Sequence, residues 1–208
     1  MPDGRFITLE GGEGVGKSTQ LKALAAALRG RGLEVIETRE PGGSPGAETI
    51  RSLLLEGEEE RWTPEAEALL FAAARADHVA RTIRPALAKG IWVVCDRFVD
   101  SSIAYQGGAG GLGFAAIRTL HEIGSNDFLP DRTLLLELDG AEGHGRAQSR
   151  DDGEADLIGG RSADYHNRVA KAFATLAAAD PARFRAIDAS GSPEEVTARL
   201  MEALEDLL

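Results

Sequence analysis

The stretch "EGGEGVGKST" (residues 10–19) decides the fold of this chain. Gly11, Gly16, Lys17 and Ser18 satisfy the pattern G-x-x-x-x-G-K-[S/T]. The apolar run "RFITLE" precedes the motif, and the helical sequence "STQLKALAAALRG" follows it. A glycine-rich turn that matches by chance would not need a strand before it and a helix after it. We therefore interpret this stretch as the phosphate-binding loop of a P-loop NTPase fold.

The loop's residue types suit the phosphates of a nucleoside triphosphate. Glycines let consecutive backbone N–H groups point at phosphate oxygens, and the helix N-terminus adds partial positive charge. We expect Lys17 to reach the β- and γ-phosphates and the Ser18 hydroxyl to ligate Mg²⁺. The predicted ATP-binding residues are Gly11, Gly12, Glu13, Gly14, Val15, Gly16, Lys17, Ser18 and Thr19.

Glu13 is unusual because it places a carboxylate among the phosphates. It needs a partner such as an arginine or a metal-bound water, since a bare carboxylate would repel the ligand. Two interpretations stay open on spacing alone. Glu13 is either an orienting group of the catalytic site or a solvated loop charge.

Five short apolar runs separated by helical stretches predict the architecture. The runs are residues 5–10, 33–38, 91–95, 132–138 and 183–188. Apolar strands alternating with helices are typical of a parallel sheet with both faces covered, which is an open three-layer α/β/α fold. Ligands of such folds bind beyond the carboxyl ends of the strands. We find no linker and predict a single domain over residues 1–208.

Helix boundaries are marked at two places. Thr63 and Pro64 predict the start of a long helix through about residue 84, where Pro85 should kink or end it. Ser192 and Glu195 form a predicted capping box for the last helix.

Composition narrows the partners and the location. The formal net charge of -11 disfavours nucleic acid and anionic membrane surfaces. No apolar run approaches the roughly 20 residues that span a bilayer, and the N-terminus has no apolar signal region. The single cysteine, Cys95, follows a buried run and is expected to be a core thiol in a reducing compartment. We expect a cytoplasmic protein.

A second group of charged residues follows the predicted strand at 91–95. Asp96 stands where P-loop proteins carry the carboxylate that holds Mg²⁺, and Arg97 is beside it. The alternative is that these two side chains pair with each other at the surface, without function. Arg39 and Arg51 add two more guanidiniums, whose forks suit phosphate oxygens. A water-directed ATPase would not need this cluster, so we expect a phosphorylated acceptor.

Phe71 and Arg75 lie four residues apart and share a helix face. Phe71 alone would usually be a core residue, but an arginine on the same apolar face needs a polar partner. A ring and a donor suit a nucleobase with a carbonyl edge, thymine or uracil. Tyr105 would then close off the 2′ position of the sugar and select deoxyribose.

The chain resembles the bacterial thymidylate kinases. The segments "FITLEGGEGVGKST", "TREPGGSPGAETIRSLLL", "EALLFAAARADHV", "VVCDRFVDSSIAYQG" and "LLLELD" match that family in order and spacing over nearly the whole chain. The resemblance implies transfer of the γ-phosphoryl group of ATP to dTMP, giving dTDP and ADP, with Mg²⁺. It also implies a five-stranded parallel sheet and a homodimer.

The resemblance also implies roles for matching residues. Arg97 would bridge the donor and acceptor phosphates, and no general base is needed because the acceptor oxygen is already anionic. The implied substrate-binding residues are Arg39, Pro41, Arg51, Phe71, Arg75, Arg97, Ser102, Tyr105 and Gln106. The implied catalytic residues are Lys17, Arg97, Glu13 and Arg150, and the implied metal ligands are Ser18 and Asp96.

The match departs from the family in a predicted mobile lid at about residues 140–161. The usual Asp-Arg-x-Glu run is replaced by "DLIG" at 156–159, and an arginine common in relatives is Gly110. The lid offers Arg146, Arg150 and Arg161. We hypothesise that Arg150 or Arg161 closes over ATP and replaces the missing charge, and we prefer Arg150. The alternative is a solvated lid in which these arginines balance nearby acidic residues.

Two other functions stay open at this point. The chain is alternatively a kinase for another deoxynucleotide or deoxynucleoside, or a nucleotide-dependent switch protein with a weakened lid. The histidines have no partners at metal-ligand spacing, and the histidines and tryptophans are expected to be surface or packing residues. They are His78, His121, His144, His166, Trp62 and Trp92.

Overall fold

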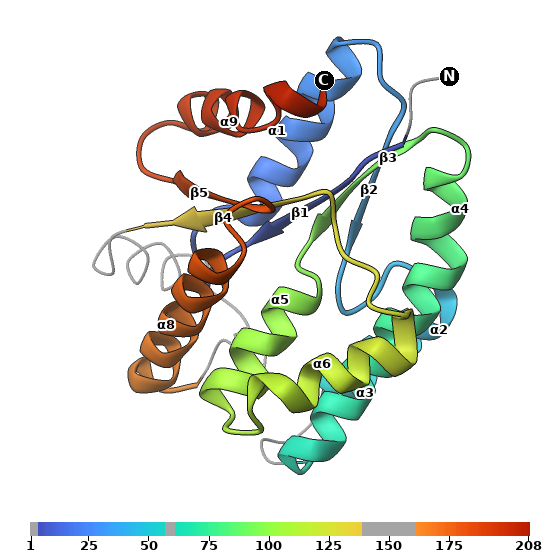
Figure 1. The fold of residues 1–208 in the computed structure, drawn as a ribbon, viewed down its shortest axis with the longest axis vertical. Helices are drawn as coiled ribbons and strands as arrows, with labels where there is room; N and C mark the ends of the chain where they lie inside the picture. Colours follow the sequence, from blue (N-terminus) through green and yellow to red (C-terminus); the bar gives the residue numbers. More distant parts are fainter. Residues whose placement is uncertain (1–3, 57–60, 139–160) are drawn as a thin grey trace.

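A computed structural model describes residues 4–56, 61–138 and 161–208. Its centre is a parallel five-stranded sheet with strand order β2-β3-β1-β4-β5 (Figure 1). The strands are β1 (Phe6–Glu10), β2 (Val35–Arg39), β3 (Trp92–Asp96), β4 (Arg132–Glu137) and β5 (Phe184–Asp188). Each of the five apolar runs forms a strand, so the predicted α/β fold is confirmed.

Helical segments connect the strands. The α-helices are α1 (Lys17–Gly30), α2 (Pro45–Leu55), α3 (Pro64–His78), α4 (Arg84–Leu87), α5 (Val99–Ser102), α6 (Phe114–Ser125), α8 (Ala163–Ala179) and α9 (Pro193–Glu202). Two π-helical segments, η1 (Val79–Ile83) and η2 (Ile103–Ala109), and the short 3₁₀ segment η3 (Glu205–Leu207) complete the described elements.

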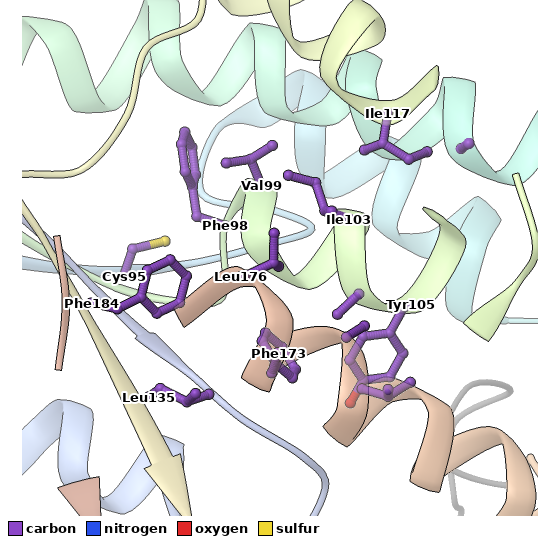
Figure 2. Close-up of a cluster of buried hydrophobic side chains, with 14 of the residues drawn as sticks. Cys95, Phe98, Val99, Ile103, Tyr105, Ile117, Leu135, Phe173, Leu176 and Phe184 are labelled. Carbon is purple, nitrogen blue, oxygen red and sulfur yellow. The ribbon is translucent and has the colours of Figure 1, made fainter. Parts of the chain in front are cut away.

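The sheet separates two hydrophobic cores. On one face, Leu24 and Leu28 of α1 and Leu200 of α9 pack against the sheet, and Figure 1 shows these two helices together on that side. On the other face, η2 and α8 pack against strand residues such as Leu135 (Figure 2). This arrangement gives the three predicted layers.

Side chains cap the helices where the sequence predicts it. The Thr63 hydroxyl accepts a hydrogen bond from the Ala66 N–H, and Ser192 and Glu195 form a complete capping box. Of the two predicted effects of Pro85, a kink or the end of the long helix near residue 84, the end is wrong. The chain stays helical to Leu87, because the wider π-helical turns of η1 come directly before Pro85 and accommodate its ring.

Several predicted packing residues lie in the cores. Trp92 and Cys95 are buried on opposite faces of the sheet, and burial raises the pKa of the Cys95 thiol. Trp62 is half-buried and donates to the Leu53 carbonyl. His121 is buried against the edge of Phe98. Among the described residues, no helix is long and apolar enough to cross a bilayer.

Candidate functional site

Three neighbouring strands end in charged residues at the same edge of the sheet. β1 ends at Glu10, β2 at Arg39 and β3 at Asp96, and the strand register pairs Arg39 directly with Asp96. A cavity of about 240 Å³ opens beyond these strand ends. It is lined by Glu13, Gly14, Gly16, Lys17, Ser18, Arg39, Glu40, Pro41, Arg51, Leu55, Phe71, Arg75, Asp96, Arg97, Phe98, Ser101, Ser102, Tyr105 and Gln106.

The predicted phosphate loop connects β1 to α1. Gly11 has a φ of 136°, and a Cβ at this position would lie 2.4 Å from the Leu136 carbonyl oxygen, so only glycine fits. The Lys17 ammonium donates to the Gly11 and Gly12 carbonyls at 3.2 and 2.6 Å. Burial and then the nearby charge of Arg97 lower the pKa of Lys17 to about 8. A buried ammonium held at the base of the loop is suited to an anionic ligand.

The other predicted ATP-binding residues lie in the same loop or in the first turn of α1. Val15 is buried in the core with α1, which anchors the loop. Thr19 donates its backbone N–H to the Gly16 carbonyl in the first helical turn. Of the nine predicted ATP-binding residues, the loop therefore presents Glu13, Gly14, Gly16, Lys17 and Ser18 to the cavity.

The two predicted metal ligands are adjacent. The Ser18 hydroxyl donates to an Asp96 carboxylate oxygen at 3.0 Å. The described residues contain no group of three or more histidine, cysteine or acidic side chains that could hold a metal ion. Mg²⁺ typically uses one or two protein oxygens together with substrate phosphates. The hydroxyl and carboxylate oxygens present here fit such a site.

Arg97 connects the phosphate loop to the rest of the cavity. Its guanidinium donates to the Gly11 carbonyl and the Ser101 hydroxyl at 3.1 and 3.0 Å, and forms an ion pair with Glu13. It also donates to the Tyr105 hydroxyl at 3.2 Å and lies over that ring. Arg97 thus pairs with Glu13, and the alternative of a simple Asp96–Arg97 surface pair is not what the structure contains.

Glu13 has the partners that its position requires. Besides Arg97, it accepts a hydrogen bond from the Tyr105 hydroxyl at 2.9 Å. Burial acts to raise the pKa of Glu13, but Arg97, then Lys17 and Tyr105, outweigh burial and lower it to about 2. Glu13 is therefore an ionised group that holds Arg97 and Tyr105, which is not the arrangement of a solvated loop charge.

The predicted acceptor-phosphate arginines come from β2 and α2: Arg39 is the last residue of β2, and Arg51 lies in α2. Arg39 is half exposed and pairs with Glu48 of α2 at 3.0 Å. Arg51 donates to the Pro41 carbonyl at 2.8 Å. Both arginines and Pro41 line the cavity, so Arg39, Arg51 and Arg97 surround one space.

The predicted base pocket is the wall made by α3 and the segment α5–η2. Phe71 is 8% exposed and is one of the residues that line the cavity. Arg75 is buried and donates to the Ser102 hydroxyl at 2.7 Å. Gln106 donates to Glu67 at 2.8 Å. The structure brings all four predicted residues, Phe71, Arg75, Ser102 and Gln106, to one wall together with Tyr105.

Comparisons with known proteins decide the family. A family model described as "Thymidylate kinase" matches residues 9–200. A thymidylate kinase from Rhizorhabdus wittichii is 68% identical over 208 residues, which cover all of both chains. One from Bradyrhizobium diazoefficiens is 48% identical, covering 99% of this chain and 90% of the relative. A crystal structure of thymidylate kinase from Ehrlichia chaffeensis has a TM-score of 0.77 at 30% identity, covering 98% of this chain and 99% of that one.

This chain belongs to the thymidylate kinase family. The family resemblance deduced from the sequence is therefore confirmed, and so is the expected fold. The match over residues 9–200 includes the phosphate loop and all residues of the predicted base pocket.

The predicted lid of this thymidylate kinase family member lies almost wholly outside the described residues. Arg146 and Arg150 fall in that segment, and Arg161 is described. Arg161 pairs with Glu67 of α3 at 2.6 Å and donates to the Tyr165 hydroxyl at 2.6 Å. It does not line the cavity in this structure. The hypothesis that Arg150 or Arg161 closes over ATP stays a prediction.

The structure adds functional candidates that sequence reasoning missed. Glu10 is fully buried and accepts from the Phe98 N–H at 2.8 Å and the Ser101 hydroxyl at 2.6 Å. Burial and then the charge of Asp100 raise the pKa of Glu10 to about 8. Its position at the end of β1, directly before the glycine loop, was the available signal, because carboxyl ends of strands gather at the ligand site.

Glu40 and His78 were missed for a different reason. Glu40 is part of the quoted "REPGG" segment, and His78 was expected to be a surface or packing residue. Both are buried, and they contact each other. Their separation by 38 positions along the chain hides this contact from any local pattern.

Proposed function

We propose that this chain transfers the γ-phosphoryl group of ATP to dTMP, giving dTDP and ADP. The observation that carries the proposal is one cavity lined by Lys17 and Ser18 of the phosphate loop, by Phe71 and Arg75 of α3, and by Arg97, which contacts both Gly11 of the loop and Ser101 of α5. Family membership supports the same reaction. Neither a switch protein nor a kinase for another acceptor is favoured by any contact in the site.

Phosphoryl transfer in this cavity depends mainly on positioning and charge. In-line transfer needs the two phosphate groups aligned and the charge on the transferring group neutralised. We propose that the loop N–H groups and Lys17 bind the ATP phosphates. Mg²⁺ held by the Ser18 hydroxyl and the Asp96 carboxylate would supply further positive charge at the phosphates. Arg97, fixed by Glu13, would lie between donor and acceptor phosphates.

The acceptor is proposed to be held at both of its ends. Arg39 and Arg51 would bind its phosphate, whose oxygen is already anionic and needs no general base. Phe71 would stack on the thymine ring, and Arg75 would donate to a ring carbonyl, with Ser102 beside it. Tyr105 would lie against the deoxyribose, where its ring leaves little room for a 2′-hydroxyl, and Gln106 would border that pocket.

A coupled assay of ADP release tests the reaction directly. The purified chain is given MgATP with dTMP, dUMP, dGMP or thymidine in parallel. We expect the highest kcat/KM with dTMP and little turnover with dGMP or thymidine. Faster turnover with thymidine would identify a nucleoside kinase, and nucleotide binding without transfer to any acceptor would identify a switch protein.

We also propose a homodimer, a single functional domain over residues 1–208 and a cytoplasmic location. The family resemblance supports the dimer, and Leu69 of α3 and Ile123 of α6 are large apolar side chains exposed on this protomer, 55% and 76% respectively. Light scattering of the purified chain during size-exclusion chromatography gives the mass. A monomeric mass at micromolar concentration would contradict the proposed dimer.

A further inference from the structure

Arg75 is held in the base-pocket wall by two sets of contacts. It is 3% exposed, and its Nε donates to a Glu40 carboxylate oxygen at 2.8 Å. Its Nη2 donates to the Ser102 hydroxyl at 2.7 Å and lies 3.5 Å from the Phe98 carbonyl. Among the described residues, these hydrogen bonds leave Nη1 as the guanidinium nitrogen available to a ligand.

Glu40 is itself fixed from behind. Its second carboxylate oxygen lies 3.1 Å from Nδ1 of His78, which is fully buried. Nε2 of the same ring lies 2.7 Å from the Thr38 hydroxyl. A neutral ring with its proton on Nδ1 satisfies both contacts, since Nδ1 then donates to Glu40 and Nε2 accepts from Thr38.

The loop after β2 closes over this chain of contacts. A Cβ at Gly43 would lie 2.3 Å from the Thr38 hydroxyl oxygen and 2.4 Å from Nε2 of His78. Gly43 also has a φ of 83°, and its carbonyl accepts from Thr82 at 2.6 Å. The backbone therefore passes directly against the Thr38–His78 contact, and the glycine is required for that approach.

We propose that Glu40, locked by His78 and Thr38, is a positioning residue that aims the Arg75 guanidinium at the acceptor nucleotide. The inference rests on the proposed function, in which Arg75 binds the thymine ring. A buried charge is normally paired, and one carboxylate shared between an arginine and a histidine fixes the direction of the arginine as well as its charge. The Glu40 carboxylate pairs with Arg75 and His78, neither of which the proposed function places at the reacting phosphates. It would therefore act on acceptor binding and not on the transfer step.

The test is the steady-state kinetics of Glu40→Gln, which keeps the side-chain size and removes the charge. We expect KM for dTMP to rise at least about tenfold, because a charge-assisted hydrogen bond is lost or misaligned. KM for ATP and kcat should stay within about twofold. Asp206→Asn is the matched control, because it removes the carboxylate partner of another buried arginine, Arg132, which does not line the cavity.

Variants of His78 keep the test decisive if Glu40→Gln does not fold. His78→Leu removes the donor to Glu40 and should raise KM for dTMP roughly threefold, the size expected for one hydrogen bond. His78→Asn places an amide N–H near Nδ1 and should restore most of the affinity.

Equal rises of both KM values, or an unchanged KM for dTMP in folded variants, would overturn the inference and leave Glu40 a purely structural residue. Failure of the wild-type chain to phosphorylate dTMP would instead overturn the proposed function. The two failures are therefore separable.

Discussion

The phosphate loop and the part of the cavity proposed to bind the acceptor, which we call the acceptor half, are built in different ways. In the loop, the Lys17 ammonium is held by backbone carbonyls of Gly11 and Gly12, so cation and partners come from seven consecutive residues. In the acceptor half, arginines are paired with carboxylates from separate segments. The pairs are Arg39 with Glu48, Arg75 with Glu40, and Arg97 with Glu13.

The phosphate loop is thus a ligand site made by backbone geometry, whereas the acceptor half is made by networks of paired side chains. A glycine loop can cradle any polyphosphate, because N–H groups carry no information about the rest of the ligand. Arginines held in fixed directions can distinguish one acceptor from another. Arg97 belongs to both parts, since it donates to the Gly11 carbonyl and pairs with Glu13.

The largest expected effect on kcat comes from replacing Arg97, which connects the phosphate loop with the acceptor half. Arg97→Lys keeps the charge but loses the planar fork, and we expect kcat to fall about 10³-fold, as for arginines that stabilise a transferring phosphoryl group. Rapid-quench or coupled assays at saturating ATP and dTMP measure it. Arg31→Lys, at an exposed pair with Glu205, is the control. A kcat within tenfold of wild type would remove Arg97 from the transfer step.

A second prediction concerns Glu10, the last residue of β1, which accepts hydrogen bonds from Phe98 and Ser101. The folded-state pKa of about 8 is above the ordinary 4.5, so the folded state keeps a proton that the unfolded state loses. Stability must then fall as pH rises from about 4.5 to about 8, by at most about 1.4 kcal/mol per pH unit. Glu10→Gln cannot ionise and should lack this component of the pH dependence.

Urea unfolding of the wild type and Glu10→Gln at pH 5 and pH 7.5 measures this component. The free energy of unfolding of the variant, relative to wild type, should increase between the two pH values. An equal difference in the free energy of unfolding at pH 5 and pH 7.5 would mean that Glu10 is ionised in the folded protein. Glu10 would then carry a full negative charge near Arg97.

A third prediction concerns the proposed acceptor half alone. Phe71→Leu removes an aromatic face from the cavity wall, and we expect KM for dTMP to rise roughly tenfold, the usual loss for one base–aromatic stack. KM for ATP should not change, because the phosphate loop does not depend on this ring. A parallel rise in both constants would indicate that Phe71 supports the whole cavity as a core residue.

The same contrast explains what the sequence could predict. The phosphate loop and the five strands are local patterns, and each was identified from contiguous residues such as 10–19. Arg39, Arg51, Phe71, Arg75 and Tyr105 were predicted from residue type and spacing, and the family resemblance added Pro41, Ser102 and Gln106. The structure brings all of them to one cavity. An arginine was one of the partners expected for Glu13. The other carboxylate partners were not predicted, because the contact of Glu40 with Arg75 or of Glu67 with Arg161 joins residues far apart along the chain.

Two features had no usable local signal. The π-helical segment η1 lies within a stretch that the sequence predicts as ordinary helix, whereas the glycine-rich stretch at 106–113, predicted to be a loop, begins within the π-helical segment η2. Such turns are set by packing around Pro85 and by the contacts of η2 with α8. The replacement for the family's lid arginine also stays undetermined from sequence. The candidates are Arg146, Arg150 and Arg161, and no motif distinguishes between them. Arg161, the one that the structure describes, forms an ion pair with Glu67.

The central claim is that donor and acceptor phosphates meet in one cavity and that the phosphoryl group passes directly between them. Initial rates over a matrix of ATP and dTMP concentrations test this most directly. Direct transfer predicts double-reciprocal lines that intersect, since both substrates must be bound before either product leaves. Parallel lines, together with a phosphorylated protein isolated in the absence of dTMP, would contradict it.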